Sequence, residues 1–492
     1  MREKSIKTAL FCILILLISP SMNVKAMDSM YTYTYDYFGD AMKSPDAYTP
    51  SYFITGNTLG IGNFKDPQGV FVKDNTIYVC DTGNNRIVII EKNADQFVVI
   101  NEFSEFDGDT AVNSLAAPHD IFVSGNGDMY ICDTNNQRIV QIDSQYRLVK
   151  EMHQPQDETI DPSLDFFPQK VVVDRLGRIF VLVKNYNKGV LVFDNKGEFT
   201  GYMGANTVKF NMIDYLWKQI STEIQRSQMV QFVPTEYNNI AIDKDGFVYA
   251  TTSVFEEYDL ISDQAKPIRK LNTMGKDILI KNGYFPPIGD VEWGDAGGVT
   301  GSSKLVDVTA LDNDTYYALD RTRGRIFGYD NQGNLLYAFG GLGNKIGYLQ
   351  YPVAIDHMGT DLLVLDTKNL GITIFTLTSY GELINDALEE YKKGNYDLSA
   401  EYWERVLMFN GNYDLAYIGI GRSLLRQKRY EEAMKYFKYK WDDNNYSKAY
   451  QLYRKEWIER NISWIFTIVV IAIAAPTISA RVKKIKREVS EA

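Results

Sequence analysis

The chain has 492 residues, of which 45% are apolar and 23% are charged, and 34 of them are tyrosines. These fractions are typical of globular proteins, and the length suffices for a large core with further modules appended to it. The formal net charge of −11 argues against a protein that follows nucleic-acid phosphates, because such a surface needs a basic stripe. We therefore expect no nucleic-acid partner.

The first 26 residues have the pattern of a secretory signal peptide. A basic start (Arg2 to Lys7) precedes an apolar stretch over residues 9–18, and Val24-Lys25-Ala26 forms a small-x-small cleavage signature. An uncleaved anchor is the alternative, but the apolar stretch is short for a membrane span. Lipid attachment at Cys12 is not expected, because the preceding Leu10-Phe11 lacks the small residue that such processing requires. We assign residues 1–26 to a signal peptide.

The next part of the chain contains an internal repeat. The segment Pro67 to Ile90 recurs as Pro118 to Ile142, and each copy holds alternating apolar runs separated by Asn, Asp and Gly. This pattern predicts a small antiparallel sheet, which cannot bury its apolar face without neighbours of the same kind. A fixed internal period therefore predicts a repeat architecture.

Fainter copies complete a set of six units between about Tyr52 and Tyr380. The four further copies open at Pro168, Asn239, Asp307 and Pro352. On these units the chain resembles the NHL-repeat family, whose repeats form the blades of a six-bladed β-propeller. The resemblance implies a mainly β propeller over residues 27–380. Some NHL propellers bind RNA, but the repeats here lack a basic face.

A carboxylate and an arginine five residues later recur in several units. This repeat signature comprises Asp81, Arg86, Asp133, Arg138, Asp320, Arg325 and Asp366. Each aspartate falls where a strand ends and a turn begins, so it can accept backbone N–H groups, and the arginines can bridge to carbonyls of the neighbouring blade. Repetition favours this structural role, because a catalytic group is needed only once. Cys80 and Cys132 occupy equivalent positions in adjacent units, so two buried thiols are expected rather than a disulfide.

The residues that open the innermost strands could converge on the central channel. We expect a polar channel mouth, with ligand-binding candidates Gln68, His119, Asp120, Gln169, Asn239 and Asp307. Enzymatic propellers of related shape, such as lactonase-like enzymes and amidating lyases, use a metal ion near this axis, and His119, Asp120 and Asp307 would form an incomplete cation site. The chain shows no catalytic triad order, phosphate-binding loop or HExxH helix. We therefore predict no catalytic residue, no resident metal and no cofactor.

Three segments depart from the repeat. Tyr31 to Phe38 alternates aromatic and polar residues, and we predict that this strand completes the last blade. Residues 205–232 carry apolar side chains at the spacing of an amphipathic helix, which forms either a lid or a plug at a blade junction. Ser262 to Ser303 is the longest irregular passage.

After the propeller, the apolar period changes to that of helices over residues 382–460. Three pairs of similar residues recur at a spacing of 34: Tyr396/Tyr430, Ser399/Ala433 and Trp403/Phe437. The pattern resembles tetratricopeptide repeats, although Gly411 stands where a proline is usual. Fewer than three repeats seldom stand alone, so this helical neck must dock on the propeller, on the next helix or on a partner. A rigid stalk and a peptide-binding surface both remain open.

Residues 461–480 contain no charge and are long enough to cross a bilayer as a helix. Basic residues dominate the following tail (residues 481–492), which predicts that this end stays in the cytoplasm. The sequence thus predicts a single-pass protein of the bacterial cell membrane, with the propeller and the neck outside. We expect a binding or scaffold protein that engages an envelope protein, a carbohydrate or a peptide. The alternative is an extracellular metal-dependent lactonase-like hydrolase or lyase that uses the channel.

Overall fold

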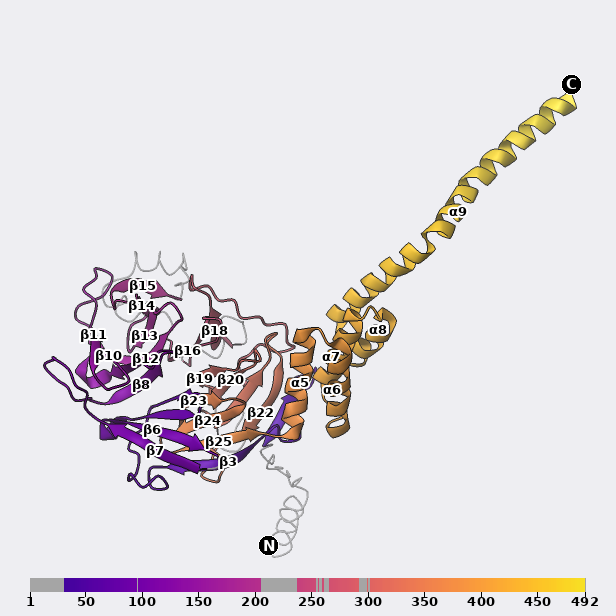
Figure 1. Ribbon diagram of the computed structural model, residues 1–492. Helices are drawn as coiled ribbons and strands as arrows, with labels where there is room; N and C mark the ends of the chain where they lie inside the picture. The colour runs from indigo at the N-terminus through magenta and orange to yellow at the C-terminus, as the bar shows by residue number, and fades with distance from the viewer. Residues whose placement is uncertain are drawn as a thin grey trace, which may run out of the picture.

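The computed structural model describes residues 31–94, 96–204, 237–253, 255, 259–260, 265–291, 299 and 301–491. In this part of the chain, six antiparallel sheets stand around a central axis as a six-bladed β-propeller, and a helical region follows (Figure 1). The fold class predicted from the repeats is confirmed. The signal-peptide assignment (residues 1–26) and the helical insertion (residues 205–232) lie outside the described residues.

Each blade begins with its innermost strand and proceeds outward through antiparallel neighbours. The first three blades are β4 (Gly69–Lys73), β5 (Thr76–Asp81), β6 (Arg86–Asn93) and β7 (Gln96–Phe103); β8 (Pro118–Val123), β9 (Met129–Asp133), β10 (Arg138–Ile142) and β11 (Leu148–Met152); and β12 (Pro168–Val173), β13 (Ile179–Val183), β14 (Val190–Phe193) and β15 (Phe199–Met203). The fourth blade shows three strands among the described residues, β16 (Asn239–Ile242), β17 (Val248–Thr251) and β18 (Ile268–Leu271). Strand β18 lies within the passage expected to be irregular.

The fifth and sixth blades both take strands from the amino-terminal segment. The fifth contains β19 (Leu305–Ala310), β20 (Tyr316–Asp320), β21 (Arg325–Tyr329) and β22 (Leu335–Gly340), extended by β1 (Thr32–Tyr35) and β2 (Ala41–Lys43). The sixth contains β23 (Pro352–Met358), β24 (Asp361–Asp366) and β25 (Gly371–Leu377), and β3 (Tyr48–Thr55) is its outermost strand.

The ring is therefore closed by β3, and the expectation for Tyr31 to Phe38 is wrong. Strand β1 pairs with β22 of the fifth blade, with Tyr33 opposite Ala338, whereas Ile54 of β3 lies opposite Ile372 of the sixth blade. Both segments alternate apolar and polar residues and both cover a sheet edge. Strand β3 pairs along all seven residues of β25 and so completes the last blade.

The hydrophobic core is divided among the junctions between blades. Separate clusters of buried side chains lie between successive blades, for example Ile54 and Val88 at the junction of the sixth and first blades. The second strands β9 and β13 are buried at every residue, because neighbouring blades cover both of their faces. A sheet of this kind is stable only inside a closed ring, since each blade supplies half of its neighbour's core.

Four short helices and one long helix follow the last blade. They are α5 (Ser379–Lys393), α6 (Tyr396–Phe409), α7 (Asp414–Arg426), α8 (Tyr430–Tyr439) and α9 (Asp443–Glu491). Thr378 caps α5 immediately after β25, and its side chain accepts a hydrogen bond from the Gly381 N–H. The helical hairpins α5–α6 and α7–α8 repeat the 34-residue spacing, so that Trp403 packs over Gly419 and Phe437 packs over Gly421.

The helical neck docks on the propeller through a shared core. One hydrophobic cluster joins Tyr48 and Phe339 of the propeller with Trp403 and Phe437 of the neck. The buried Tyr413 hydroxyl donates a hydrogen bond of 2.8 Å to the carbonyl of Leu336 in β22. Docking on the propeller and on α9 thus provides the packing that two helical hairpins lack by themselves.

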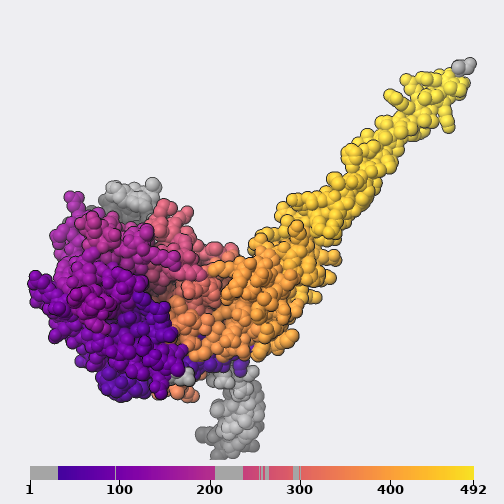
Figure 2. Space-filling model, viewed as in Figure 1, coloured from indigo at the N-terminus to yellow at the C-terminus, as the bar shows by residue number. Residues whose placement is uncertain are grey.

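Helix α9 leaves the neck as a single rod, which Figures 1 and 2 show projecting away from the propeller. At 1.5 Å per residue, its 49 residues extend for about 74 Å. Its first turns pack on the neck through the buried Ala449, and its apolar part is long enough to cross a membrane. The helix continues through Pro476.

Candidate functional site

The recurring aspartates of the first two blades hold turns. Asp81 accepts the Lys65 N–H at 2.7 Å and the Arg86 Nε–H at 2.8 Å, and Asp133 accepts the Ala116 N–H and the Arg138 Nε–H at the same distances. Both carboxylates are fully buried. The Nη2 atom of each arginine donates to a carbonyl of the linker that precedes its own blade, whereas a bridge to the neighbouring blade was expected. Each pair therefore fixes the entry of its blade.

The fifth blade replaces this pair with a different arrangement. Asp320 accepts the Lys304 N–H and the Ser303 hydroxyl, whereas Arg325 pairs with Asp290, a residue of the passage that follows β18. Asp290 also accepts the hydroxyl of Tyr33, at 2.7 Å. The expected bridge from Arg325 to a neighbouring carbonyl is thus replaced by an ion pair that ties β1 to the fifth blade. In the sixth blade, Asp366 accepts the Gln350 N–H at 2.6 Å.

The central channel contains a buried ion pair. Asp120 on β8 lies 3.1 Å from the Lys170 Nζ on β12, and both side chains are less than a tenth exposed. The second carboxylate oxygen of Asp120 accepts the Val171 N–H at 3.0 Å. Burial raises the pKa of Asp120, and the Lys170 ammonium opposes that shift. For Lys170 itself, burial lowers the pKa but attraction to Asp120 and Asp307 outweighs it, so its pKa is raised.

Two further carboxylates join neighbouring innermost strands in the same way as Asp120. Asp307 on β19 accepts the Ile355 N–H of β23 at 2.8 Å, and Asp356 on β23 accepts the Val72 N–H of β4 at 2.7 Å. Burial raises the pKa of Asp307 to about 7, although Lys170 and two backbone N–H groups act in the opposite direction. These carboxylates therefore serve as cross-links around the axis, and the last of them joins the sixth blade to the first.

The remaining channel candidates are also engaged in local contacts. His119 lies with its Nδ1 3.0 Å from the Gln169 carbonyl, so this nitrogen carries the hydrogen; burial and Lys170 lower the pKa of His119 to about 4. The Asn239 side chain accepts its neighbour's N–H, and the Gln68 side chain turns to Asp66 in the linker. These contacts are all made at or just before the innermost strands.

This channel chemistry gives no support to the metal-dependent alternative. Among the residues that the structure describes, no three His, Cys, Asp or Glu side chains are grouped as metal ligands. Asp120 faces an ammonium group, and the oxygens of Asp307 are occupied by N–H groups. Lys170 is the residue that the sequence reasoning missed, since it considered the preceding Gln169. Asp120, Lys170 and Asp307 are each the third residue of their innermost strand, and this change of charge at an equivalent position was the available signal.

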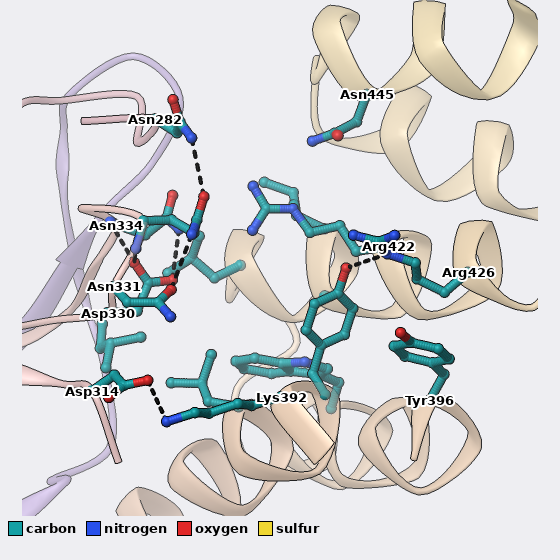
Figure 3. A pocket seen from close by; sticks show the side chains of 18 of the residues that line it. Asn282, Asp314, Asp330, Asn331, Asn334, Lys392, Tyr396, Arg422, Arg426 and Asn445 are labelled. Carbon is teal, nitrogen blue, oxygen red and sulfur yellow. Dashed lines mark hydrogen bonds and ion pairs between the residues drawn. The ribbon is translucent and has the colours of Figure 1, made fainter. Parts of the chain in front are cut away.

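A cleft of about 500 Å³ lies between the fifth blade and the neck (Figure 3). Its propeller wall consists of the turns that join β19 to β20 and β21 to β22, and its other wall is formed by α5, α7 and the start of α9. One hydrophobic cluster joins the propeller and the neck, which form the two walls. We name this space the neck cleft.

The neck cleft contains four basic side chains, and only two of them have a polar partner among the described residues. Lys392 pairs with Asp314 across the cleft, and the Arg426 Nε donates to the Tyr391 hydroxyl at 3.3 Å. Arg422 and Lys448 make no hydrogen bond or ion pair with any described residue. In Figure 3 the Arg422 side chain extends from α7 into the space in front of Asn334 and Asp330.

Asp330 shows how the neck changes the chemistry of a common turn. Its carboxylate accepts the N–H groups of Gln332 and Asn334, as Asp143 and Asp194 do with their own turns in other blades. The pKa of Asp143 and of Asp194 is lowered, first by a backbone hydrogen bond. The neck covers Asp330, so burial raises its pKa, and the nearby Arg422 opposes this rise. The turn is repeated, but its environment is unique to the neck cleft.

One family model and several solved structures are similar to this chain. Residues 64–90 match the NHL repeat family model. Virginiamycin B lyase from Staphylococcus aureus is similar over 67% of this chain and 100% of its own, with 12% identity and a TM-score of 0.40. Kuenenia stuttgartiensis hydrazine synthase is similar over 65% of this chain and 97% of its own, with 11% identity and a TM-score of 0.39. No curated protein matches the chain.

Proposed function

We propose that this protein is a membrane-anchored, extracytoplasmic binding protein that engages an envelope protein or an extracellular ligand in the neck cleft. The observation that carries the proposal is the cleft itself, in which Arg422 and Lys448 lack partners among the described residues. The two walls of the cleft share one hydrophobic core, so the site is preorganised and little conformational entropy is lost when a ligand binds.

The neck supports a binding role over a purely structural stalk. We infer that its two hairpins are tetratricopeptide-like, because Gly421 allows Phe437 to cross it closely and Ser399 bonds to the carbonyl of Ala387 at 2.8 Å. The first helix of each hairpin, α5 and α7, contributes side chains to the neck cleft. A stalk would not require polar side chains on that face.

Helix α9 supports the anchoring part of the proposal. Ile462, Phe466 and Ile473 are more than half exposed, and the apolar window of the helix is not covered by the rest of the described molecule. Burial in a bilayer would remove this apolar surface from water. The basic residues after position 480 favour a cytoplasmic carboxyl end by the positive-inside rule.

Thiol labelling in intact cells tests this orientation. Ser144→Cys on an exposed propeller turn and Ser490→Cys in the tail are each treated with a membrane-impermeant maleimide. We expect the first to react in intact cells and the second only after lysis. Cys80 and Cys132 are buried and provide an unreactive background. The opposite labelling pattern would refute the proposed topology.

Photocrosslinking tests the binding site. A benzophenone amino acid replaces Asn331, which is exposed at the rim of the neck cleft, in the full-length protein in its native membrane. The matched control carries the same group at Lys196, an exposed turn residue of the third blade. We expect a defined adduct from the Asn331 variant only. Equal adducts from both positions, or none above background from either, would count against the neck cleft as the binding site.

A further inference from the structure

We propose that the ligand of the neck cleft is an acidic peptide segment, one carboxylate of which pairs with Arg422. This inference rests on the proposed function, because it assigns the ligand chemistry of the same cleft. It does not depend on which envelope protein supplies the peptide.

Positive charge is concentrated in the neck cleft. The chain carries a net charge of −11, and yet four of the six charged side chains that line the neck cleft are basic. Two of these cations are neutralised or held locally, Lys392 by Asp314 and Arg426 by Tyr391. Arg422 and Lys448 remain available on the helical wall. A guanidinium offers two parallel N–H groups that match a carboxylate, so Arg422 is the natural anchor.

Six amide side chains line the neck cleft: Asn282, Asn313, Asn331, Gln332, Asn334 and Asn445. Each of these amides already uses at least one donor or acceptor in a hydrogen bond to a neighbouring residue. A side-chain amide both donates and accepts hydrogen bonds, so the remaining N–H and C=O groups can pair with those of an extended peptide. Leu388, Leu415 and Ile418 line the same space and offer apolar contact to intervening side chains.

The acidic residues of the neck cleft do not favour a basic ligand. Asp330 already accepts two N–H groups from its own turn and a third hydrogen bond from the Asn334 side chain, at 2.7 Å. Asp314 is engaged by Lys392. Neither carboxylate is free to pair with a cationic peptide without losing these bonds, whereas Arg422 gains a partner.

The test uses the full-length protein in phosphatidylcholine nanodiscs and fluorescence anisotropy. The probe is a labelled hexapeptide of alternating glutamate and leucine, and the matched probes replace glutamate by glutamine or by lysine. We expect the acidic probe to bind at least tenfold more tightly than the other two. Raising the salt from roughly 50 to 300 mM should weaken its binding, because part of the attraction is screened.

Variants locate the binding site. Arg422→Gln should weaken binding of the acidic probe about tenfold and Lys448→Gln two- to threefold, since an anchoring charge pair accounts for about one decade of affinity. The control Arg405→Gln removes an exposed arginine of α6 that does not line the neck cleft, and it should leave the affinity unchanged. An unaltered melting temperature for each variant shows that the fold is intact.

Each outcome decides the proposal. Equal affinity for the three probes, or an Arg422→Gln variant that binds as the wild type does, would overturn it. Displacement of the acidic probe by millimolar inorganic phosphate without loss of peptide selectivity would support a shared anion site at Arg422. Binding of phosphate alone, with no binding of the acidic probe, would overturn the peptide assignment. A cleft-specific crosslink from Asn331 combined with no peptide selectivity would leave the proposed function standing and remove only this inference.

Discussion

The buried ion pair in the channel allows a test of whether Lys170 stabilises the propeller by compensating buried carboxylates. Lys170→Met keeps an unbranched side chain of similar length but removes the ammonium that lies 3.1 Å from Asp120. The variant leaves two buried carboxylates, Asp120 and Asp307, without the cation that attracts both of them. Removal of one partner of a buried pair typically costs about 3–5 kcal/mol, because the remaining charge loses its compensation.

Two features limit the loss of stability in the Lys170→Met variant to about 3–5 kcal/mol. Asp120 keeps the hydrogen bond from the Val171 N–H, and its carboxyl can take up a proton instead of remaining charged. For a domain larger than 250 residues, a loss of 3–5 kcal/mol corresponds to a fall in melting temperature of about 4–8 °C. The control Lys196→Met, at an exposed turn of the neighbouring hairpin, should change the melting temperature by less than about 1 °C.

The pH dependence separates a loss of charge from a loss of packing. In the Lys170→Met variant, the pKa of Asp120 in the folded state lies further above its unfolded value than in the wild type. The folded state then binds protons more readily than the unfolded state, so its stability is retained at low pH and falls as the pH rises through that pKa. The difference in stability between the wild type and the Lys170→Met variant should therefore be larger at pH 8 than at pH 5.

The assay is intrinsic tryptophan fluorescence of the detergent-solubilised protein during heating, at both pH values. The double variant Asp120→Asn/Lys170→Met removes both charges and retains an acceptor for the Val171 N–H, so it should recover most of the lost stability. A deficit that does not depend on pH, or a double variant as unstable as Lys170→Met, would refute the electrostatic explanation.

Three further outcomes follow from the same structure. In the folded state the pKa of His119 is lowered to about 4. The unfolded chain therefore binds the proton more readily between about pH 4 and 6.5, and the folded state loses stability on acidification. The variant His119→Gln should raise the melting temperature at pH 5 and leave it unchanged at pH 8. Deleting residues 31–43 should expose the β22 edge and promote aggregation of a still cooperative propeller, whereas deletion of residues 31–55 should abolish cooperative melting. Tyr413→Phe leaves the Leu336 carbonyl without its donor, which costs about 1–2 kcal/mol and should speed proteolysis of the neck but not of the propeller.

The parts of the structure that repeat were predictable from the sequence. Equivalent residues such as Asp81 and Asp133 recur at a fixed spacing, so the same local hydrogen bond forms in more than one blade. The sequence predicted that an amino-terminal strand closes the ring, but it did not predict which strand. Tyr31 to Phe38 and Tyr48 to Thr55 both have the pattern of an edge strand, and only the register with β22 and β25 distinguishes them.

Contacts that occur once were not predictable. Asp290 replaces the repeat aspartate as the partner of Arg325, although 35 positions separate them and Asp290 lies in an irregular passage. Lys170 compensates Asp120 from the next blade, 50 positions away. Asp290 leaves no periodic trace in a single sequence. Asp120 and Lys170 stand at equivalent repeat positions, but which residues pair is determined by how the blades are placed in the ring.

The same reasoning explains why the neck cleft is the place to look for function. A propeller of similar blades presents similar turns around its rim, and Asp143, Asp194 and Asp330 hold three of them with the same bonds to the N–H groups two and four residues further on. Repetition gives the rim no preferred position for a ligand. The neck covers one of these turns, reverses the direction of its pKa shift and places Arg422 in front of it. Specific recognition requires a feature that is not shared by all blades, and the docked neck supplies that feature at the fifth blade.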